Sequence, residues 1–167
     1  MQMQFGVPVS GSDHSMLPSD KPMRIVLSSV SSDSHTWNLV FLQLFLEFKG
    51  HEVCNLGSCT PDADIVSACE EMVPDLLVIS SVNGHGNIDG ERLIRKLRKN
   101  NALVDLPVAI GGKLGIHGAD NTQYVDRLIN VGYTAVFEAS SSIGLFEEFV
   151  KSISSRLNNP MTLRVMS

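Results

Sequence analysis

Five short apolar runs alternate along this chain with five longer segments that have helical periodicity. Two of the runs, at 24–27 and 75–81, are apolar on both faces, which is typical of strands buried on both sides of a sheet. The predicted strands span 23–30, 51–57, 75–81, 106–110 and 133–138, and the predicted helices span 37–49, 60–73, 88–99, 119–130 and 143–157. Strict alternation of this kind, connected by right-handed crossovers, predicts a doubly wound α/β sheet.

The number of strands sets the expected topology. Five βα units favour a parallel sheet of flavodoxin-like order 2-1-3-4-5, with helices on both faces. We expect Gly50 to terminate the first helix, Thr60 to cap the second and Asn87 to cap the third. The residues of the first helix that should face the core are Leu39, Leu42, Phe45 and Leu46, with Val40 and Phe41 as further candidates.

Length, charge and cysteine content limit the class of protein. The 167 residues suit one domain, which we place at 22–158 between a flexible extension, 1–21, and a loose tail, 159–167. A net charge of -5 disfavours a nucleic-acid partner, and no apolar run is long enough to span a bilayer. The basic residues from Arg92 to Lys99 are expected to form a solvated helix face. Three cysteines without a C-x-x-C pair, and an N-terminus unlike a signal peptide, predict a reduced, cytoplasmic protein.

Three unusual turns follow the first, third and fourth predicted strands. They contain Asp33-Ser34-His35, Ser80-Ser81-Val82 and Gly111-Gly112. In the expected strand order, the carboxyl ends of the first and third strands form the switch point at which ligands bind. A carboxylate such as Asp33 can accept the proton of one imidazole nitrogen of His35 and leave the other nitrogen free to bind a metal. The alternative is that the two residues are a solvated loop pair without a metal.

Glycines at two of these strand ends are consistent with the close approach of a large ligand. Gly84 and Gly86 follow the third strand, and Gly111 and Gly112 follow the fourth. Each pair alone fits ordinary turn chemistry, but their combination with an Asp-x-His turn favours a binding site. Neither G-x-x-x-x-G-K-[ST] nor G-x-G-x-x-G occurs, so the sequence lacks the fingerprints of nucleotide-phosphate sites.

At these three turns the sequence resembles the cobalamin-binding domains of base-off/His-on type, in which a protein histidine replaces the lower ligand carried by the cofactor. The family signature D-x-H-x-x-G, S-x-L and G-G corresponds to residues 33–38, 80–82 and 111–112. Within that family, residues 79–89 are similar to the S-S-L-Y-G-Q-G-E-I-D segment of the small subunit of glutamate mutase, also called methylaspartate mutase. The resemblance extends over 23–157.

The resemblance implies a role for each matching residue. His35 would bind the cobalt of cobalamin, Asp33 would hydrogen-bond His35, and Ser80 would meet the displaced benzimidazole of the cofactor. Gly111 and Gly112 would line the slot for the nucleotide tail. The complete set of expected cofactor contacts is Asp33, Ser34, His35, Thr36, Asn38, Ser80, Val82, Gly84, Gly111 and Gly112.

Two positions depart from the family pattern. Asn38 stands in place of the glycine, where we expect it to be tolerated because asparagine adopts left-handed or tight backbone more readily than most residues. Val82 replaces leucine, which is a mild apolar exchange. For His85 and His117, contact with the corrin or a partner and plain exposure in a loop both remain open. Trp37 would either pack on the corrin or anchor the start of its helix.

The resemblance implies the cobalamin-binding small subunit of an adenosylcobalamin-dependent carbon-skeleton mutase, which converts glutamate to 3-methylaspartate. The chain is too short to contain the barrel that holds substrate in such enzymes. We therefore expect a separate large catalytic subunit, no catalytic residue on this chain and no activity by the chain alone. The alternative is a non-enzymatic module, either a corrinoid methyl carrier or a sensor, but such proteins carry a helical domain for which residues 1–21 are too few. A receiver-like domain is disfavoured because Ser80-Ser81 stand where its third strand would end in aspartate.

Overall fold

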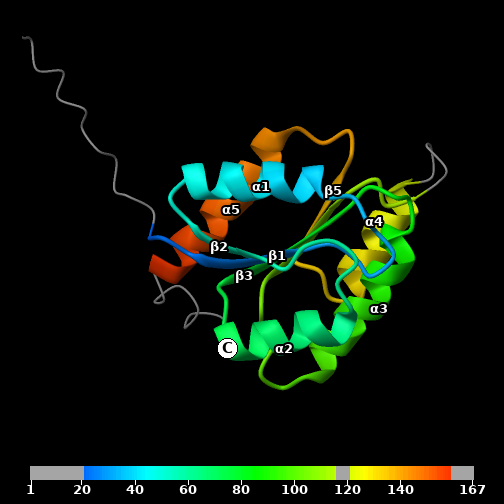
Figure 1. The fold of residues 1–167 in the computed structure, drawn as a ribbon, viewed down its shortest axis with the longest axis horizontal. Coiled ribbons are helices and arrows are strands. Elements are labelled where there is room, and N and C mark those ends of the chain that lie inside the picture. The colour runs from blue at the N-terminus through cyan, green and yellow to red at the C-terminus, as the bar shows by residue number, and fades with distance from the viewer. Residues whose placement is uncertain (1–20, 116–120, 159–167) are drawn as a thin grey trace, which may run out of the picture.

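The computed structural model describes residues 21–115 and 121–158, which form a five-stranded parallel sheet with helices on both faces (Figure 1). The strands are β1 (Arg24–Ser28), β2 (Glu52–Asn55), β3 (Leu76–Ser81), β4 (Val108–Gly112) and β5 (Ala135–Glu138). The helices are α1 (Trp37–Phe48), α2 (Asp62–Met72), α3 (Gly86–Lys99), α4 (Asn121–Asn130) and α5 (Ile143–Asn158). The strand order β2-β1-β3-β4-β5 confirms the predicted flavodoxin-like topology.

Alternation along each strand divides the core into two layers. Ile25 and Leu27 of β1 pack with α1 and α5, whereas Val26 packs with α2, α3 and α4 on the opposite face (Figure 1). Successive side chains of a strand point to opposite faces of its sheet. At the end of β3, Ser80 therefore lies on the side of α1 and α5, and Ser81 lies on the side of α3.

Of the three residues predicted to cap or terminate helices, one has the predicted role and two do not. Gly50 follows α1 with a φ of +90°, as expected for a glycine that terminates a helix. Thr60 does not cap α2, because its hydroxyl donates to the carbonyl oxygen of Gly57 at 3.0 Å. Asn87 lies inside α3, which begins one residue earlier, so its predicted role as a cap is wrong.

Helix α1 exposes more apolar surface than the sequence predicts. The main expected core residues are buried or partly buried: Leu39, Leu42, Phe45 and Leu46. Val40 and Phe41, in contrast, are 51% and 52% exposed, so their expected burial is wrong. The sheet covers only one stripe of the helix, because residues three and four positions apart share a face and their neighbours do not.

The basic segment of α3 is only in part the solvated face that the sequence predicts. Lys96, Arg98 and Lys99 occupy the last turn, where positive charge complements the helix dipole. Arg98, however, donates to the carbonyl oxygen of Gly132 at 2.7 Å. Arg92 bridges two aspartates close to the candidate site.

Two expectations about the ends of the chain fall outside what the structure describes. The predicted extension, 1–21, is described only at Lys21, and the predicted tail, 159–167, is not described. Within the described residues, none of the helices is long and apolar enough to span a bilayer.

Candidate functional site

The loop between β1 and α1 places a buried carboxylate beside an exposed imidazole. Asp33 is fully buried, and its Oδ2 accepts hydrogen bonds from the Ser81 hydroxyl at 3.0 Å and from the Val82 N–H at 2.6 Å. Its Oδ1 accepts a hydrogen bond from the His35 N–H at 3.0 Å and lies 2.7 Å from His35 Nδ1. The carboxylate therefore joins this loop to the end of β3.

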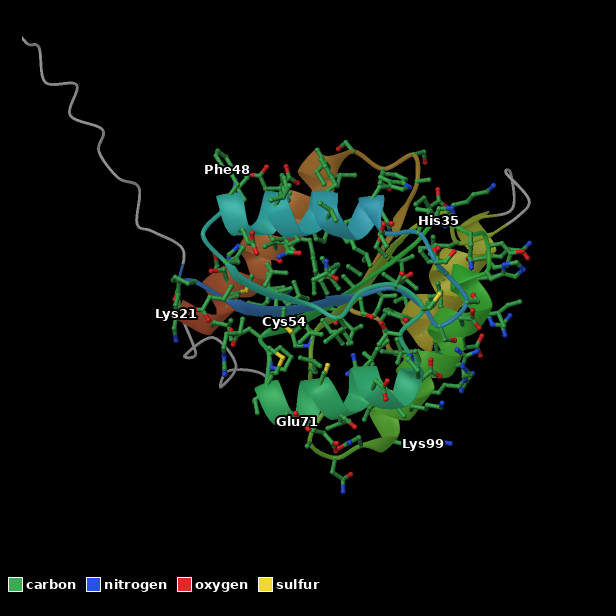
Figure 2. All side chains as sticks on the ribbon, viewed as in Figure 1. Lys21, His35, Phe48, Cys54, Glu71 and Lys99 are labelled. Carbon is green, nitrogen blue, oxygen red and sulfur yellow. The ribbon has the colours of Figure 1, made fainter. Side chains whose placement is uncertain are left out.

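Asp33 is held in its ionised form and thereby fixes the tautomer of His35. Burial opposes ionisation of this carboxylate, but hydrogen bonds from His35, Val82 and Ser81 hold its pKa below the usual value of 3.8. An ionised carboxylate beside Nδ1 favours the tautomer with the proton on that nitrogen. The His35 side chain is 48% exposed, and the residue lies at the carboxyl edge of the sheet, opposite the end that carries Lys21 (Figure 2). This tautomer leaves Nε2 of His35 with a free lone pair.

A cleft of about 480 Å³ opens beside this loop, between α1, α5 and the carboxyl ends of β3, β4 and β5. Trp37 and Phe41 of α1 and Phe137 of β5 give the cleft apolar walls. Ser80 adds a polar group, and Gly111 adds a stretch of wall without a side chain. An apolar cleft with a few polar groups is typical of a binding site for an organic ligand.

Asn38 joins α1 to β3 across one wall of this cleft. Its Nδ2 donates to Ser80 Oγ at 2.7 Å and lies 3.4 Å from the Ser80 carbonyl oxygen. Asn38 is the second residue of α1 and is not among the described residues with positive φ, so the expectation of left-handed backbone at this position is wrong. The residue is 4% exposed, and its Oδ1 has no hydrogen-bond partner among the described residues.

Backbone geometry explains the glycines near the ends of β3 and β4. Gly111 and Gly112 lie within β4, where they pair with Ser80 and Ser81 in parallel register. Gly112 has a φ of +107°, and a Cβ atom at this position would lie 2.1 Å from the carbonyl oxygen of Ser81. Gly84 also has a positive φ, of +85°. Only glycine allows this backbone conformation and this close approach without strain.

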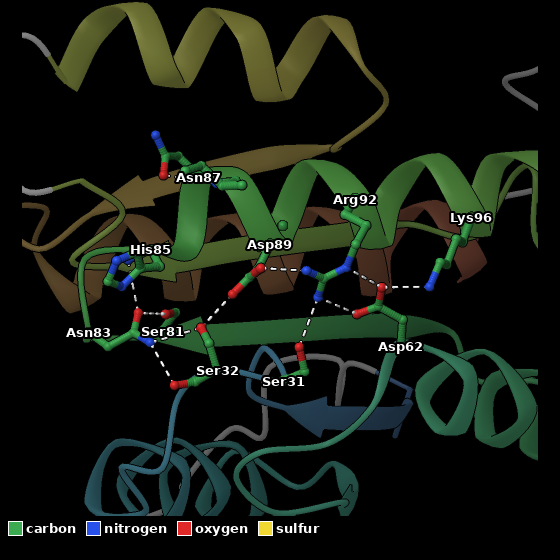
Figure 3. Close-up of polar contacts among 12 residues, drawn as sticks. Ser31, Ser32, Asp62, Ser81, Asn83, His85, Asn87, Asp89, Arg92 and Lys96 are labelled. Atoms are coloured by element: carbon green, nitrogen blue, oxygen red, sulfur yellow. Dashed lines mark hydrogen bonds and ion pairs between the residues drawn. The ribbon is translucent and has the colours of Figure 1, made fainter.

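A polar network that the sequence did not predict holds the same loop from the side of α3 (Figure 3). The Ser32 hydroxyl contacts the Asp89 carboxylate, and Asn83 Nδ2 donates to the Ser32 carbonyl oxygen at 2.9 Å. Arg92 links Asp89 to the buried Asp62 of α2, with Arg92 Nε 2.7 Å from Asp62 Oδ2. One indication of this network is present in the sequence, because Asp89 lies in the segment 79–89 that resembles the mutase family.

The ten expected contact residues gather at one edge of the sheet, but only half of them line the cleft. The residues that line it are Asn38, Ser80, Val82, Gly111 and Gly112. The residues exposed on the loop are Ser34, His35 and Thr36, and those buried behind it are Asp33 and Gly84. His85 is exposed, and His117 lies outside the described residues.

This arrangement suits a metal that arrives with most of its ligands already in place. In the described ranges 21–115 and 121–158, no three His, Cys, Asp or Glu side chains converge as metal ligands. A single imidazole could serve as one ligand of a metal whose other ligands come with a cofactor.

Comparisons with known proteins identify the family. Residues 23–135 match the model of the B12 binding domain. The glutamate mutase sigma subunit of Fusobacterium nucleatum subsp. nucleatum is 28% identical over 120 residues, which cover 72% of this chain and 88% of that subunit. Glutamate mutase sigma subunit 1 of Haloarcula marismortui is 29% identical over 120 residues, which cover 72% of this chain and 78% of that subunit.

A solved structure extends the likeness to three dimensions. The crystal structure of a cobalamin-binding protein from Desulfitobacterium hafniense has a TM-score of 0.58 and 27% identity, covering 70% of this chain and 53% of that one. This chain thus spans about half the length of that protein. The match over residues 23–135 includes all three turns of the resemblance, and the chain belongs to the B12-binding domain family.

Proposed function

We propose that this chain is the cobalamin-binding subunit of an adenosylcobalamin-dependent carbon-skeleton mutase, acting in the cytoplasm with a separate catalytic subunit. Support comes from the two glutamate mutase sigma subunits, which are similar over 72% of the chain. The reaction that corresponds to these relatives is the isomerisation of glutamate to 3-methylaspartate.

The observation that carries this proposal is the Asp33–His35 pair at the mouth of the cleft. Asp33 accepts the Nδ1 proton, so His35 Nε2 would bind the cobalt of cobalamin, and the cleft would hold the nucleotide tail. Ser80 and Gly111 would then face that tail. Adenosylcobalamin supplies the radical chemistry of the rearrangement when it is bound.

The cleft is not built to hold a dicarboxylate substrate. Within the part of the chain that the structure describes, its walls contain Lys113 and Glu138 but no arginine. The substrate would therefore be held by a partner that meets a rim at the carboxyl edge of the sheet, formed by residues 33–38, 82–87 and 113–115. A barrel-type subunit closing over this rim would exclude water from reactive intermediates.

A spectral titration tests the proposed ligand. The full chain mixed with adenosylcobalamin should give the base-off/His-on absorption spectrum. His35→Ala should lose that spectrum and bind at least about 100-fold more weakly, because the metal loses its protein ligand. Lys99→Ala, which removes an exposed side chain at the far end of α3, is the control and should behave as wild type. Wild-type spectrum and affinity in His35→Ala would remove His35 as the ligand.

A reconstitution experiment tests the two-subunit arrangement. The barrel-type large subunit from the same organism should be retained by this chain when adenosylcobalamin is present and much less without it. The mixture should isomerise glutamate, and neither chain should do so alone. Turnover by the isolated chain would contradict the two-subunit proposal, and methyl transfer without isomerisation would favour the corrinoid methyl carrier instead.

A further inference from the structure

The outward face of α1 carries a stripe of large apolar side chains. Five residues of this helix are each more than half exposed: Trp37, Val40, Phe41, Leu44 and Phe48. Figure 2 shows Phe48, which is 86% exposed, on the side of the helix away from the sheet. Glu47 is the one charged side chain in α1. A helix that is apolar on all sides is normally covered on all sides, so the outward face is expected to have a partner.

The spacing of these residues is that of a seam between two helices. Steps of four, three and four residues separate Trp37, Phe41, Leu44 and Phe48, which we call the α1 seam. Alternating steps of three and four residues are the pattern by which two α-helices pair in a coiled coil. The exposed face of α3, in contrast, carries charged residues such as Arg95 and Lys99, as a solvated helix face does.

The α1 seam is complementary to itself, because its steps read the same in both directions. In an antiparallel pair of α1 helices, Trp37 of each copy would face Phe48 of the other. Phe41 of each copy would face Leu44 of the other. Every residue of the seam would then meet an apolar residue across one two-fold axis, and two-fold dimers of this kind are the commonest protein oligomers.

The charge on α1 also favours the antiparallel arrangement. In a parallel pair the Glu47 side chains of the two copies would lie close together, and like charges at an interface oppose association. In an antiparallel pair they would lie at opposite ends of the contact. The two helix dipoles would also be opposed rather than aligned.

The area of the stripe is enough for a specific contact. A covered aromatic side chain buries about 150–250 Å², so the exposed fractions of the five residues correspond to roughly 500 Å² of surface per copy. Two copies would bury roughly 1,000 Å², which is close to the smallest area of a specific interface. We therefore expect a reversible contact with a dissociation constant on the order of micromolar.

We infer that two copies of this chain pair through the α1 seam, with the two helices antiparallel. This inference goes beyond the proposed function, because the contact uses no cobalamin and no catalytic subunit. Trp37 and Phe41 belong both to the seam and to the lining of the cleft, whereas Leu44 and Phe48 do not line the cleft. Substitutions of Leu44 and Phe48 therefore test the pairing without altering the cleft.

Two measurements on the full chain without cobalamin test the pairing. Sedimentation velocity over a series of concentrations should show a reversible equilibrium between one chain and two. Trp37 is the only tryptophan, so its fluorescence reports on this position alone. Its emission should shift to shorter wavelength as the dimer forms, because the indole leaves water and packs against Phe48 of the second copy.

Variants of the seam assign the interface. Leu44→Lys should weaken the dimer at least about 100-fold, because the two-fold axis places the new charge in the apolar contact twice. Phe48→Lys should act in the same direction. Lysine is a good helix former, and circular dichroism checks that both variants fold. Ile129→Lys is the control, because it changes an exposed apolar residue of α4, on the opposite face of the sheet, and should dimerise as wild type.

The other outcomes overturn the inference. A chain that stays monomeric at all concentrations has no such contact. A dimer that persists in both seam variants, or that forms without a shift in the Trp37 emission, uses another surface. If the chain alone is monomeric and Leu44→Lys instead prevents retention of the barrel-type subunit, the seam binds that subunit and not a second copy.

Discussion

The two faces of the sheet are built differently, although they share the same five strands. On the face of α2, α3 and α4 the core is closed, and α3 approaches so closely that a Cβ atom at Gly90 would lie 2.5 Å from Ile110 Cδ1. On the face of α1 and α5, a cleft of about 480 Å³ remains open at the carboxyl ends of the strands. We call the closed side the scaffold face and the side that contains the cleft the binding face, after the proposed function.

Polar groups follow the same division. On the scaffold face the buried Tyr133 donates its hydroxyl to the Gly90 carbonyl oxygen at 2.9 Å, and burial raises its pKa well above the usual value. On the binding face the Asn38–Ser80 bond leaves one buried acceptor unpaired. Buried polar groups are nearly always hydrogen-bonded in native proteins. Asn38 Oδ1, like Ser29 Oγ, is an exception to this rule among the described residues.

The largest expected effect is a difference between the two faces in how much a Leu→Ala substitution lowers the free energy of unfolding. Leu93 is fully buried on α3, whereas Leu42 lines the cleft from α1. Leu93→Ala should lower the free energy of unfolding by about 2–5 kcal/mol, because it leaves a cavity in a closed core. Leu42→Ala should cost about 1 kcal/mol or less, because its side chain already borders open space. Urea unfolding followed by circular dichroism measures both, and equal losses would contradict the division into scaffold and binding face.

Strand topology explains why much of the candidate site could be predicted from the sequence. Asp33, Ser80 and Gly111 are far apart in the chain, but each follows or ends a parallel strand. Parallel strands bring their carboxyl ends to one edge, and the order 2-1-3-4-5 makes β1, β3 and β4 neighbours there. Because neighbouring parallel strands end at the same edge, their last residues lie side by side, and Ser80 is therefore paired with Gly111.

Contacts between side chains of different elements could not be predicted in the same way. The residue type of Asn38 suggested left-handed backbone, but its role depends on how α1 packs against β3. Thr60 and Asn87 are residue types that cap helices, and here they form other local hydrogen bonds instead. The ion pair between Asp62 and Arg92 joins two helices, so no local pattern indicates it.

The next prediction concerns Asp33, which lies where the two faces meet. It bonds to Ser81 on the scaffold side and to His35 at the mouth of the cleft. Asparagine offers one acceptor oxygen where aspartate offers two, so Asp33→Asn cannot accept all of these hydrogen bonds. We expect the affinity for cobalamin to fall about 10–100-fold in a spectral titration. Unchanged affinity would remove Asp33 from the site.

A scaffold variant provides the control for this measurement. Asp62→Asn also replaces a buried aspartate, but Asp62 lies on α2 and bonds to Arg92 rather than to the loop of His35. Its affinity for cobalamin should stay within about two-fold of wild type, because Asp62 reaches the loop of His35 only indirectly, through Arg92. A matching loss in both variants would show that the two faces are coupled through the network around Arg92 (Figure 3).

The smallest expected effect concerns the ion pairs of the scaffold face. Asp62 is 5% exposed, accepts hydrogen bonds from Arg92, and lies 2.9 Å from Lys96 Nζ. Burial opposes its ionisation, but the hydrogen bonds and charges of Arg92 and Lys96 hold its pKa below the usual value of 3.8. Asp62→Asn should lower the free energy of unfolding at pH 7 by about 1–2 kcal/mol, a modest loss because both cationic partners are partly exposed to solvent.

The dependence on pH is the sharper test of this ion pair. Because the pKa of Asp62 is lower in the folded protein, its stabilising contribution is complete above the unfolded value of 3.8 and is lost as the pH falls toward the folded value. The free energies of unfolding of wild type and Asp62→Asn should differ by a constant amount from about pH 5 to 7 and converge below about pH 4. Asp64→Asn, which removes an exposed carboxylate from the same helical turn, should show a smaller difference throughout. A difference that grows as the pH falls would mean that the charge of Asp62 does not stabilise the scaffold face, and apolar packing alone would then distinguish the two faces.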